Sequence, residues 1–328
     1  MGVPNIEIPE PLVRGFTLFG AAKPFFPPTT TIFFRQALGY NPPYFLSLFI
    51  MSYALVLQHP SIESRELSRL ARYVTLPPPH NHTSIRIPVS AEFCLPADIA
   101  EDLDTQKIDF AILPDMRFEE LGLIVSDMDS TLITIECIDE IAAGVGLKNE
   151  VAAITERSMR GELDFEQSLR QRVSLLKGLK EQVLQQVYDQ ILQLSPGAEY
   201  LLAECKKHNV KFMLVSGGFT FFTDRLKSRL GLDYAYANEL SSINGILNGQ
   251  LEGRIIDAQA KANLLIEHRN ALGLDAKQVL AIGDGANDIP MLEAAGIGIA
   301  YRAKPKAQAH ADARINHHGL EAVRGWFV

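Results

Sequence analysis

The chain has 328 residues, more than one average domain contains, and its 47% hydrophobic and 21% charged residues can bury the core of an ordinary globular protein. The formal net charge of −8 argues against a general nucleic-acid binder, which needs a basic surface. The three cysteines, Cys94, Cys137 and Cys205, form no CxxC pair, which disfavours a disulfide framework and a zinc site.

No segment indicates export or membrane insertion. Residues Met1 to Glu10 lack the basic and apolar regions of a signal peptide. The most apolar run, Tyr44 to Leu57, is shorter than the roughly 20 residues that a bilayer requires. We therefore expect a soluble protein with no membrane partner, in a reducing, cytoplasmic setting.

The first part of the chain, residues 1–115, predicts a small α+β domain. Its first forty residues are rich in proline and aromatic residues and show no period. After them the pattern predicts a strand in Tyr44–Leu57, a helix in Ile62–Tyr73 with Ser61 as its N-cap, and strands at Ile85–Val89 and Asp109–Leu113. The sequence leaves open the ligand of this domain and whether it regulates the rest.

Residues 116–328 show a different pattern, that of a parallel sheet. Three short apolar runs, Leu121–Val125, Val210–Val215 and Val279–Ile282, each end at polar residues and are separated by helical stretches. Such runs are typical of strands buried on both faces. Ligands of open α/β sheets bind beyond the carboxyl ends of the strands. One crevice is therefore expected to collect Asp127, Asp129, Ser216 and Asp284.

Two insertions interrupt this pattern. The residues between the first two runs are mostly helical in period and predict a cap at about 140–196. Between the second and third runs, Ile243–Leu251 contains the turn signals Asn244-Gly245 and Asn248-Gly249, which predict a β-hairpin flap. The expected fold class is thus α/β, with a Rossmann-like parallel sheet, a helical cap insertion and a β-hairpin flap beside the small N-terminal α+β domain.

Two acidic loops carry the candidate chemistry. With Asp127 and Asp129 two residues apart at a strand end, one carboxylate can attack phosphorus while the other protonates the leaving oxygen. Asp284, in Gly283–Asp288, is placed to complete a Mg²⁺ site with them, since Mg²⁺ prefers oxygen ligands. The alternative for both loops is an ordinary turn, in which Asp and Ser bond their own backbone.

Two further segments are candidate phosphate ligands. The hydroxyl of Ser216 and the backbone N–H groups around Gly217 can bind phosphate oxygens, although Ser-Gly turns are common. Lys261 lies beside the apolar stripe of its helix, where it is either a lysine with a buried stem or a cation that balances a phosphoryl group.

One cap helix is informative about the substrate. Asp164 and Gln167 resemble a capping box, so a helix is expected to begin at Phe165. Arg172 borders its apolar stripe. It either covers the stripe at the surface or faces the crevice to hold a carboxylate.

Together these segments resemble the haloacid dehalogenase-like superfamily and, within it, the phosphoserine phosphatase family. The resemblance covers about Leu121 to the C-terminus, departs from the family at Met128, where Phe is frequent, and is most specific in the cap. It is carried by Asp127–Leu132, Glu136–Ala142, Met159–Leu176, Ser216–Phe219 and Gly283–Asp288.

The resemblance implies a role for each candidate residue. Asp127 would be the nucleophile and Asp129 the general acid and then base. Mg²⁺ would be held by Asp127, the backbone carbonyl of Asp129 and Asp284, with Asp288 acting through water. The substrate O-phospho-L-serine would be bound through its phosphate by Ser216, Gly217 and Lys261, with Asn287 nearby, through its ammonium by Glu136 and through its carboxylate by Arg172, between Met159 and Phe165.

The implied reaction is the hydrolysis of O-phospho-L-serine to L-serine and phosphate, the last step of serine biosynthesis. The alternatives are a phosphatase or phosphotransferase for another small phosphomonoester, and a catalytically idle amino-acid sensor. A P-type pump is excluded, because the loop is not DKTGT-like and no membrane span is expected. The oligomeric state stays open, with a homodimer as one alternative.

Overall fold

The computed structural model describes residues 52–62, 67–76 and 82–328. The chain divides into two units, residues 1–40 and 41–328, and all described residues belong to the second. Its strands are β1 (Tyr53–Ile62), β2 (His82–Val89), β3 (Asp109–Pro114), β4 (Leu123–Ser126), β5 (Lys211–Phe219), β6 (Tyr234–Ile243), β7 (Ile246–Glu252), β8 (Val279–Gly283), β9 (Ile297–Tyr301) and β10 (Ala313–Ile315). Its α-helices are α1 (Ala97–Thr105), α2 (Cys137–Gly144), α3 (Lys148–Met159), α4 (Phe165–Ser174), α5 (Gln182–Gln190), α6 (Ala198–Lys207), α7 (Thr220–Leu230), α8 (Ala258–Ala271), α9 (Ile289–Ala294), α10 (Pro305–Gln308) and α11 (Glu321–Gly325).

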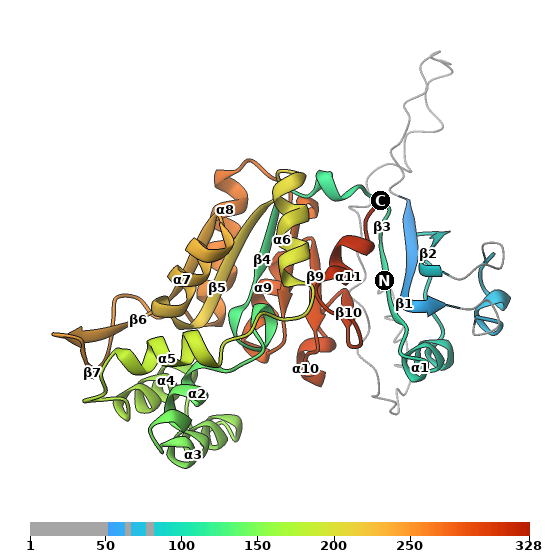
Figure 1. Ribbon diagram of the computed structural model, residues 1–328. Coiled ribbons are helices and arrows are strands. Elements are labelled where there is room, and N and C mark those ends of the chain that lie inside the picture. The colour runs from blue at the N-terminus through green and yellow to red at the C-terminus, as the bar shows by residue number, and fades with distance from the viewer. Residues whose placement is uncertain (1–51, 63–66, 77–81) are drawn as a thin grey trace, which may run out of the picture. The chain divides into compact units, whose positions relative to one another are not determined.

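The described strands form one sheet, in the order β2-β1-β3-β10-β9-β8-β4-β5-β6-β7 (Figure 1). Neighbouring strands from β10 through to β6 are parallel. All residues of β4, β8 and β9 are buried, as expected for parallel strands covered on both faces. The predicted α/β class with a parallel sheet is confirmed.

Helices supply the cover on each face of this sheet. Because side chains alternate along a strand, Ile124 of β4 packs into one core cluster while Leu123 and Val125 pack into another. The first cluster includes Leu201 of α6 and the second includes Leu265 of α8. The strand ends are therefore held at fixed positions by packing on both sides.

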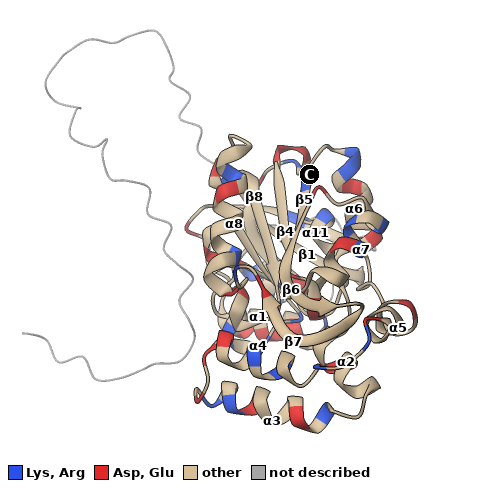
Figure 2. Ribbon diagram, turned by 90° about the vertical axis from the view of Figure 1, so that its left-hand side faces the viewer, with Lys and Arg blue, Asp and Glu red and all other residues tan. Residues whose placement is uncertain are grey.

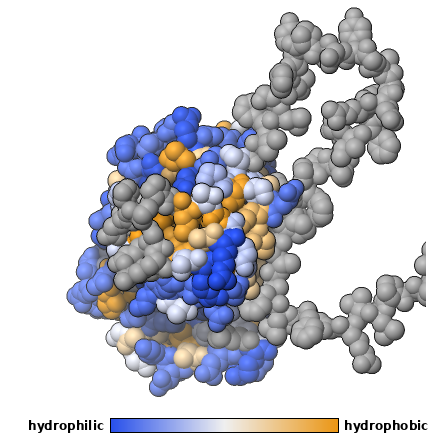
Figure 3. All heavy atoms as spheres, turned by 90° about the vertical axis from the view of Figure 1, so that its right-hand side faces the viewer, coloured by the Kyte–Doolittle hydropathy of each residue, from blue (hydrophilic) through white to orange (hydrophobic). Residues whose placement is uncertain are grey.

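Strand β1 is antiparallel to both of its neighbours, β2 and β3, and the three strands have their own apolar core. They extend the sheet through β3, which pairs with β10 at Ala111 and Ala313. Figure 3 views the end of the described part that carries β2 and shows an apolar area bordered by hydrophilic residues. The predicted strands at Ile85–Val89 and Asp109–Leu113 are confirmed. A domain boundary near residue 115 stays a prediction.

The predicted helix N-cap at Ser61 is wrong, because Ser61 and Ile62 belong to β1. The strand continues past Pro60 through an irregular register, and Ile62 pairs with His82 and is fully buried. Burial of Ile62 in the apolar core of β1, β2 and β3 outweighs the local capping preference of serine. Residues Tyr44–Met51 and 63–66, on which parts of the predicted strand and helix fall, lie outside the described residues.

Four helices, α2 to α5, follow β4 and lie together at one end of the sheet (Figure 2). Helix α4 begins at Phe165, as predicted, with the side chain of Asp164 accepting from the N–H of Gln167 and the side chain of Gln167 accepting from the N–H of Asp164. We call α2–α5 the cap.

A hairpin formed by β6 and β7 contacts this cap. Its turn is Asn244-Gly245, with φ angles of 53° and 74°, as a tight hairpin requires. The second predicted turn, Asn248-Gly249, is wrong, because both residues lie inside β7. Gly249 has a φ of 79°, and a Cβ there would lie 2.9 Å from the Cβ of Lys177, so its lack of a side chain permits the close contact with the cap.

Candidate active site

A cavity of about 190 Å³ lies where the carboxyl ends of the parallel strands meet the cap. Nine of the residues predicted from the sequence line it: Asp127, Asp129, Glu136, Phe165, Arg172, Ser216, Gly217, Asp284 and Asn287. Lys261 and Asp288 do not line the cavity but are buried beside it, where Lys261 donates to both Asp127 and Asp288. The prediction that Asp127, Asp129, Ser216 and Asp284 lie in one crevice is therefore confirmed, although their segments are far apart in the sequence.

Lys261 is the cation at the centre of the site. Its side chain is 1% exposed, and its Nζ lies 2.6 Å from Oδ1 of Asp127 and 2.8 Å from Oδ1 of Asp288. Burial alone would lower the pKa of Lys261, but the two carboxylates outweigh it and raise that pKa. The alternative of a lysine whose charged end reaches solvent is excluded by this burial.

The carboxylates of Asp127, Asp284 and Asp288 each offer an oxygen within 4.8 Å of the others. Burial and the charge of Asp288 raise the pKa of Asp127 well above its usual range, against the opposing effect of Lys261. Burial and the same neighbour raise the pKa of Asp284 to about 6. The three carboxylates carry more negative charge than the single lysine can balance, and their oxygens are hard ligands. The cluster therefore fits a divalent cation.

Asp129 lies in an irregular turn, Met128–Leu132, in which Ser130 adopts a left-handed φ of 56°. The backbone N–H of Cys137, in the first turn of α2, donates to Oδ1 of Asp129 over 3.2 Å. Burial and the charge of Glu136 raise the pKa of Asp129 to about 7, although the hydrogen bonds from Cys137 oppose them. A carboxyl group with such a pKa can both give and accept a proton near neutral pH.

The segment Ser216-Gly217-Gly218 lies within β5, at an irregularity in its pairing with β6. The strand therefore extends past the predicted end at Val215. The hydroxyl of Ser216 accepts from the N–H of Gly218, and the side chain of Asn238 donates to the carbonyl of Gly217. A Cβ on Gly218 would lie 2.9 Å from Oδ2 of Asp129, so glycine allows the strand and the acidic turn to approach closely.

The second acidic loop is organised by Asp288. Its Oδ2 accepts from the backbone N–H groups of Asp284 and Gly285, while its Oδ1 accepts from Lys261. The side chain of Asn287 donates to the same Oδ1 over 3.4 Å and also lines the cavity. Asp288 thus fixes the loop that presents Asp284.

The cap and the residue just before it contribute a carboxylate, a guanidinium group and an aromatic ring to the cavity. Glu136, just before α2, accepts from the hydroxyl of Ser130 over 2.7 Å. Burial lowers the pKa of Arg172, and the nearby charges of Asp139, Glu136 and Asp129 oppose that effect. The ring of Phe165 lies against Gly217. Arg172 and Glu136 therefore face one cavity from different segments.

Lys304 is the one charged lining residue of this cavity that the sequence patterns did not predict, and the side chain of one predicted residue is not described. Lys304 lines the cavity after β9, whose apolar run Ile297–Tyr301 ends at the same edge of the sheet and could have been found by the same rule. Met159 is the last residue of α3, and its side chain lies outside the described part of the structure.

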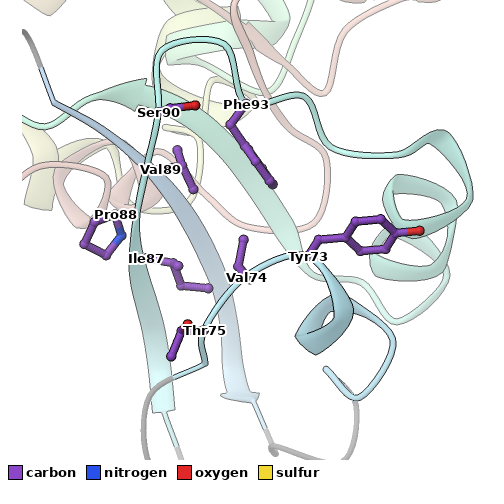
Figure 4. A pocket seen from close by; sticks show the side chains of 8 residues that line it. All are labelled: Tyr73, Val74, Thr75, Ile87, Pro88, Val89, Ser90 and Phe93. Atoms are coloured by element: carbon purple, nitrogen blue, oxygen red, sulfur yellow. The ribbon is translucent and has the colours of Figure 1, made fainter.

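A larger cavity, of about 480 Å³, lies beside β2 (Figure 4). Its lining comes from β2 and from the segments 73–75 and 90–93, and it includes the apolar side chains of Val74, Ile87, Val89 and Phe93. None of its lining residues is charged. It therefore offers no charged group for phosphoryl transfer. The charged groups that suit this reaction line the smaller cavity at the strand ends. None of the helices in the described ranges has the length and apolarity that a bilayer crossing requires.

Known proteins are similar to this chain in sequence and in structure. The family of haloacid dehalogenase-like hydrolases matches residues 124–293. A phosphoserine phosphatase of Polaromonas sp. is 49% identical over 215 residues, which are 64% of this chain and 91% of that protein. The unliganded crystal structure of a probable phosphoserine phosphatase from Vibrio cholerae has a TM-score of 0.73 and 38% identity, and the match covers 84% of this chain and 86% of that one.

A solved complex of a phosphoserine phosphatase with its substrate has a TM-score of 0.60 and 39% identity, over 63% of this chain and 99% of that one. The family match alone spans more than half of the sequence. It also contains the acidic turn, the cap, Lys261 and the loop of Asp284. On this evidence the chain belongs to the haloacid dehalogenase-like hydrolases.

Proposed function

We propose that this chain hydrolyses O-phospho-L-serine to L-serine and inorganic phosphate through an aspartyl phosphate on Asp127, the reaction that ends serine biosynthesis. One observation carries the proposal: a single cavity joins the carboxylates of Asp127 and Asp129 to the oppositely charged pair Glu136 and Arg172. The first pair suits phosphoryl transfer, and the second suits a zwitterionic amino acid. The similarity to phosphoserine phosphatases along most of their length supports the same reaction.

In the first step a carboxylate oxygen of Asp127 attacks phosphorus, and the bond from phosphorus to the serine oxygen breaks. Oδ1 of Asp127 is held by Nζ of Lys261 and by the N–H of Met128, 2.8 Å away. These bonds fix the orientation of the carboxylate before the substrate arrives, which lowers the entropic part of the barrier. Lys261 also offsets the negative charge that gathers on the phosphoryl group.

Asp129 moves the protons in both steps. In its acid form it gives a proton to the departing serine oxygen. It then takes a proton from the water that attacks phosphorus, so that the bond to Asp127 breaks and phosphate leaves. A pKa of about 7 suits both roles, because neither form of Asp129 is scarce near neutral pH.

The buried carboxylate cluster would hold Mg²⁺. Asp127, Asp284 and the main-chain carbonyl of Asp129 are the proposed ligands, and Asp288 acts through water. When bound, the ion supplies positive charge to the phosphoryl oxygens. The number and hardness of the oxygen donors support Mg²⁺ over a metal that prefers nitrogen or sulfur.

The cap would recognise the serine part of the substrate. Arg172 binds the carboxylate and Glu136 the ammonium, while Phe165 and Met159 close the sides. Ser216, Gly217 and Asn287 complete the phosphate site. Closure of the cap over the bound substrate would exclude bulk water from the aspartyl phosphate. A cytoplasmic location stays a prediction.

Phosphate release from L-phosphoserine, measured with Mg²⁺ and with EDTA, tests this function. The wild-type protein should prefer L-phosphoserine to phosphothreonine and sugar phosphates and should lose its activity in EDTA. The Asp127→Asn variant should release no phosphate above background, whereas Asp224→Asn, an exposed change on α7, should match the wild type. Turnover by Asp127→Asn at the wild-type rate would refute the mechanism, and a preference for another phosphomonoester would refute the substrate.

A further inference from the structure

Lys304 brings a cation to the cavity from a fourth strand end. It follows β9, which is parallel to β8, and the two strands are paired at Gly283 and Ala300. The residues just beyond that pair are Asp284 on one strand and the segment leading to Lys304 on the other. Lys304 consequently lines the same cavity as Asp284 and Asn287.

The backbone around Lys304 is held in place. Arg302 adopts a left-handed φ of 45°, uncommon for a residue with a side chain, and its N–H donates to the carbonyl of Ile315 over 2.7 Å. The N–H of Lys304 then donates to the carbonyl of Asp284 over 3.0 Å. Pro305 begins α10 immediately after. A strained turn kept by specific hydrogen bonds is more common at functional sites than elsewhere.

The charges that line the cavity are unbalanced. Four carboxylates line it, those of Asp127, Asp129, Glu136 and Asp284, against the cations of Arg172 and Lys304. Arg172 is half-buried near three acidic groups. Within residues 52–62, 67–76 and 82–328, the exposed Nζ of Lys304 forms no hydrogen bond and no ion pair. Its charge still lowers the pKa of Asp284, against burial and nearby carboxylates that raise it.

We propose that Lys304 is a substrate-positioning residue whose ammonium group binds the phosphate dianion of substrate and product at the mouth of the cavity. This inference rests on the proposed function. Phosphoserine carries a phosphate dianion, a carboxylate and an ammonium group, so it is an anion that approaches a cavity lined by four carboxylates. A free, exposed cation on a fixed backbone attracts such a ligand and holds its phosphate toward Asp127.

The position of Lys304 predicts an effect on binding more than on the chemical step. Lys261 already lies against Asp127 inside the site, whereas Lys304 lies on the solvent side and makes no side-chain contact with the reacting carboxylates. The loss of Lys304 should therefore raise KM, weaken inhibition by inorganic phosphate and leave kcat nearly unchanged.

Three variants of the full-length, Mg²⁺-loaded protein test the proposal. Lys304→Met removes the charge and keeps the length of the side chain, Lys304→Arg keeps the charge, and Lys306→Met removes an exposed lysine of α10 that does not line the cavity. KM, kcat and the inhibition constant of phosphate are measured at low and high ionic strength, and thermal unfolding checks the fold.

Lys304→Met is expected to raise KM and the phosphate inhibition constant about tenfold, as for the loss of one charge-assisted hydrogen bond, with kcat within about twofold. It should also flatten the dependence of kcat/KM on ionic strength. Lys304→Arg should recover most of the binding, and Lys306→Met should behave as the wild type. Unchanged KM and phosphate inhibition in Lys304→Met, or a fall in kcat at constant KM, would overturn the proposal.

The outcome for Lys304 can be separated from that for the proposed function. If the wild-type protein does not hydrolyse phosphoserine, the proposed function fails. Binding of inorganic phosphate to the Mg²⁺-loaded protein, measured by calorimetry, still reports on Lys304: weaker binding by Lys304→Met than by Lys306→Met supports the inference, and equal binding refutes it.

Discussion

Replacement of Lys261 by methionine isolates the buried charge at the centre of the site. Methionine nearly matches the length of lysine but carries no ammonium group. In the Lys261→Met variant the carboxylates of Asp127 and Asp288 would lose the bonds of 2.6 and 2.8 Å that now hold them. Both carboxylates are almost fully buried, so water cannot replace the lysine.

The expected loss of stability is large because one partner of a buried ion pair is removed. Such a change costs about 3–5 kcal/mol, since it leaves an uncompensated charge in the interior. In a protein of this size about 1 kcal/mol corresponds to a shift of roughly 2–4 °C in Tm, so Tm should fall by on the order of 10 °C. Activity should be lost as well, because Asp127 is no longer oriented.

Urea-induced unfolding in the presence of EDTA measures this loss without a contribution from bound metal. Lys206→Met, an exposed change in the last turn of α6, is the matched control and should alter the free energy of unfolding by less than about 0.5 kcal/mol. A double variant with Asp288→Asn should be less destabilised than the sum of the two single variants, by about 1–3 kcal/mol. A loss below about 1 kcal/mol in Lys261→Met would refute the buried pair.

Two more predictions concern the cap and the N-terminal strands. Arg172→Ala should lower kcat/KM for phosphoserine by about 100-fold, the loss expected for a strong charge-assisted pair, and should leave hydrolysis of p-nitrophenyl phosphate nearly unchanged. Arg170→Ala, exposed on the same helix and paired with Glu166, is the control, and an equal loss on both substrates would contradict the proposed role. Burial alone would raise the pKa of Asp109, but hydrogen bonds from the ring of His318 and from three backbone N–H groups outweigh it and lower that pKa. Because the folded-state pKa of Asp109 lies below the unfolded value near 3.8, its charged carboxylate stabilises the fold above that value, and this stabilisation is lost as pH falls through the folded-state pKa. Asp109→Asn should therefore cost about 1–3 kcal/mol at pH 7 and less in acid. Urea unfolding across pH measures this, with the exposed Asp104→Asn as control, and a cost that does not shrink in acid would contradict the assignment.

Much of the site could be predicted because its residues follow local patterns with a fixed spatial meaning. An apolar run that ends at Asp127 and another that ends at Gly283-Asp284 place both loops at one edge of a parallel sheet. The capping box at Asp164 fixes the start of α4 and hence the face on which Arg172 lies. Short-range signals suffice there because the hydrophobic pattern of the same segments agrees with them.

The errors fall where distant contacts decide. Ser61 has the local chemistry of a helix cap, but Ile62 is buried against a strand that lies some twenty residues ahead. Asn248-Gly249 has the signature of a turn, yet both residues lie in β7, which pairs with β6, and Gly249 packs closely against Lys177. The pairing of β3 with β10 joins Ala111 to Ala313, which are far apart in the sequence, and no local pattern at either residue indicates it. The local sequence patterns used for prediction carry no signal for these distant contacts.

The cost of the buried charges argues that the acidic turn and loop serve function and not merely chain reversal. Asp127, Asp129 and Asp284 all have raised pKa values because burial and neighbouring carboxylates disfavour their charged forms. A turn at the surface would satisfy its aspartates with water at no such cost. Among the described residues, Lys261 is the buried cation that offsets this charge, and its ammonium group donates to Asp127 and Asp288. Selection for stability would remove such an arrangement, so its presence indicates a ligand that carries positive charge into the site.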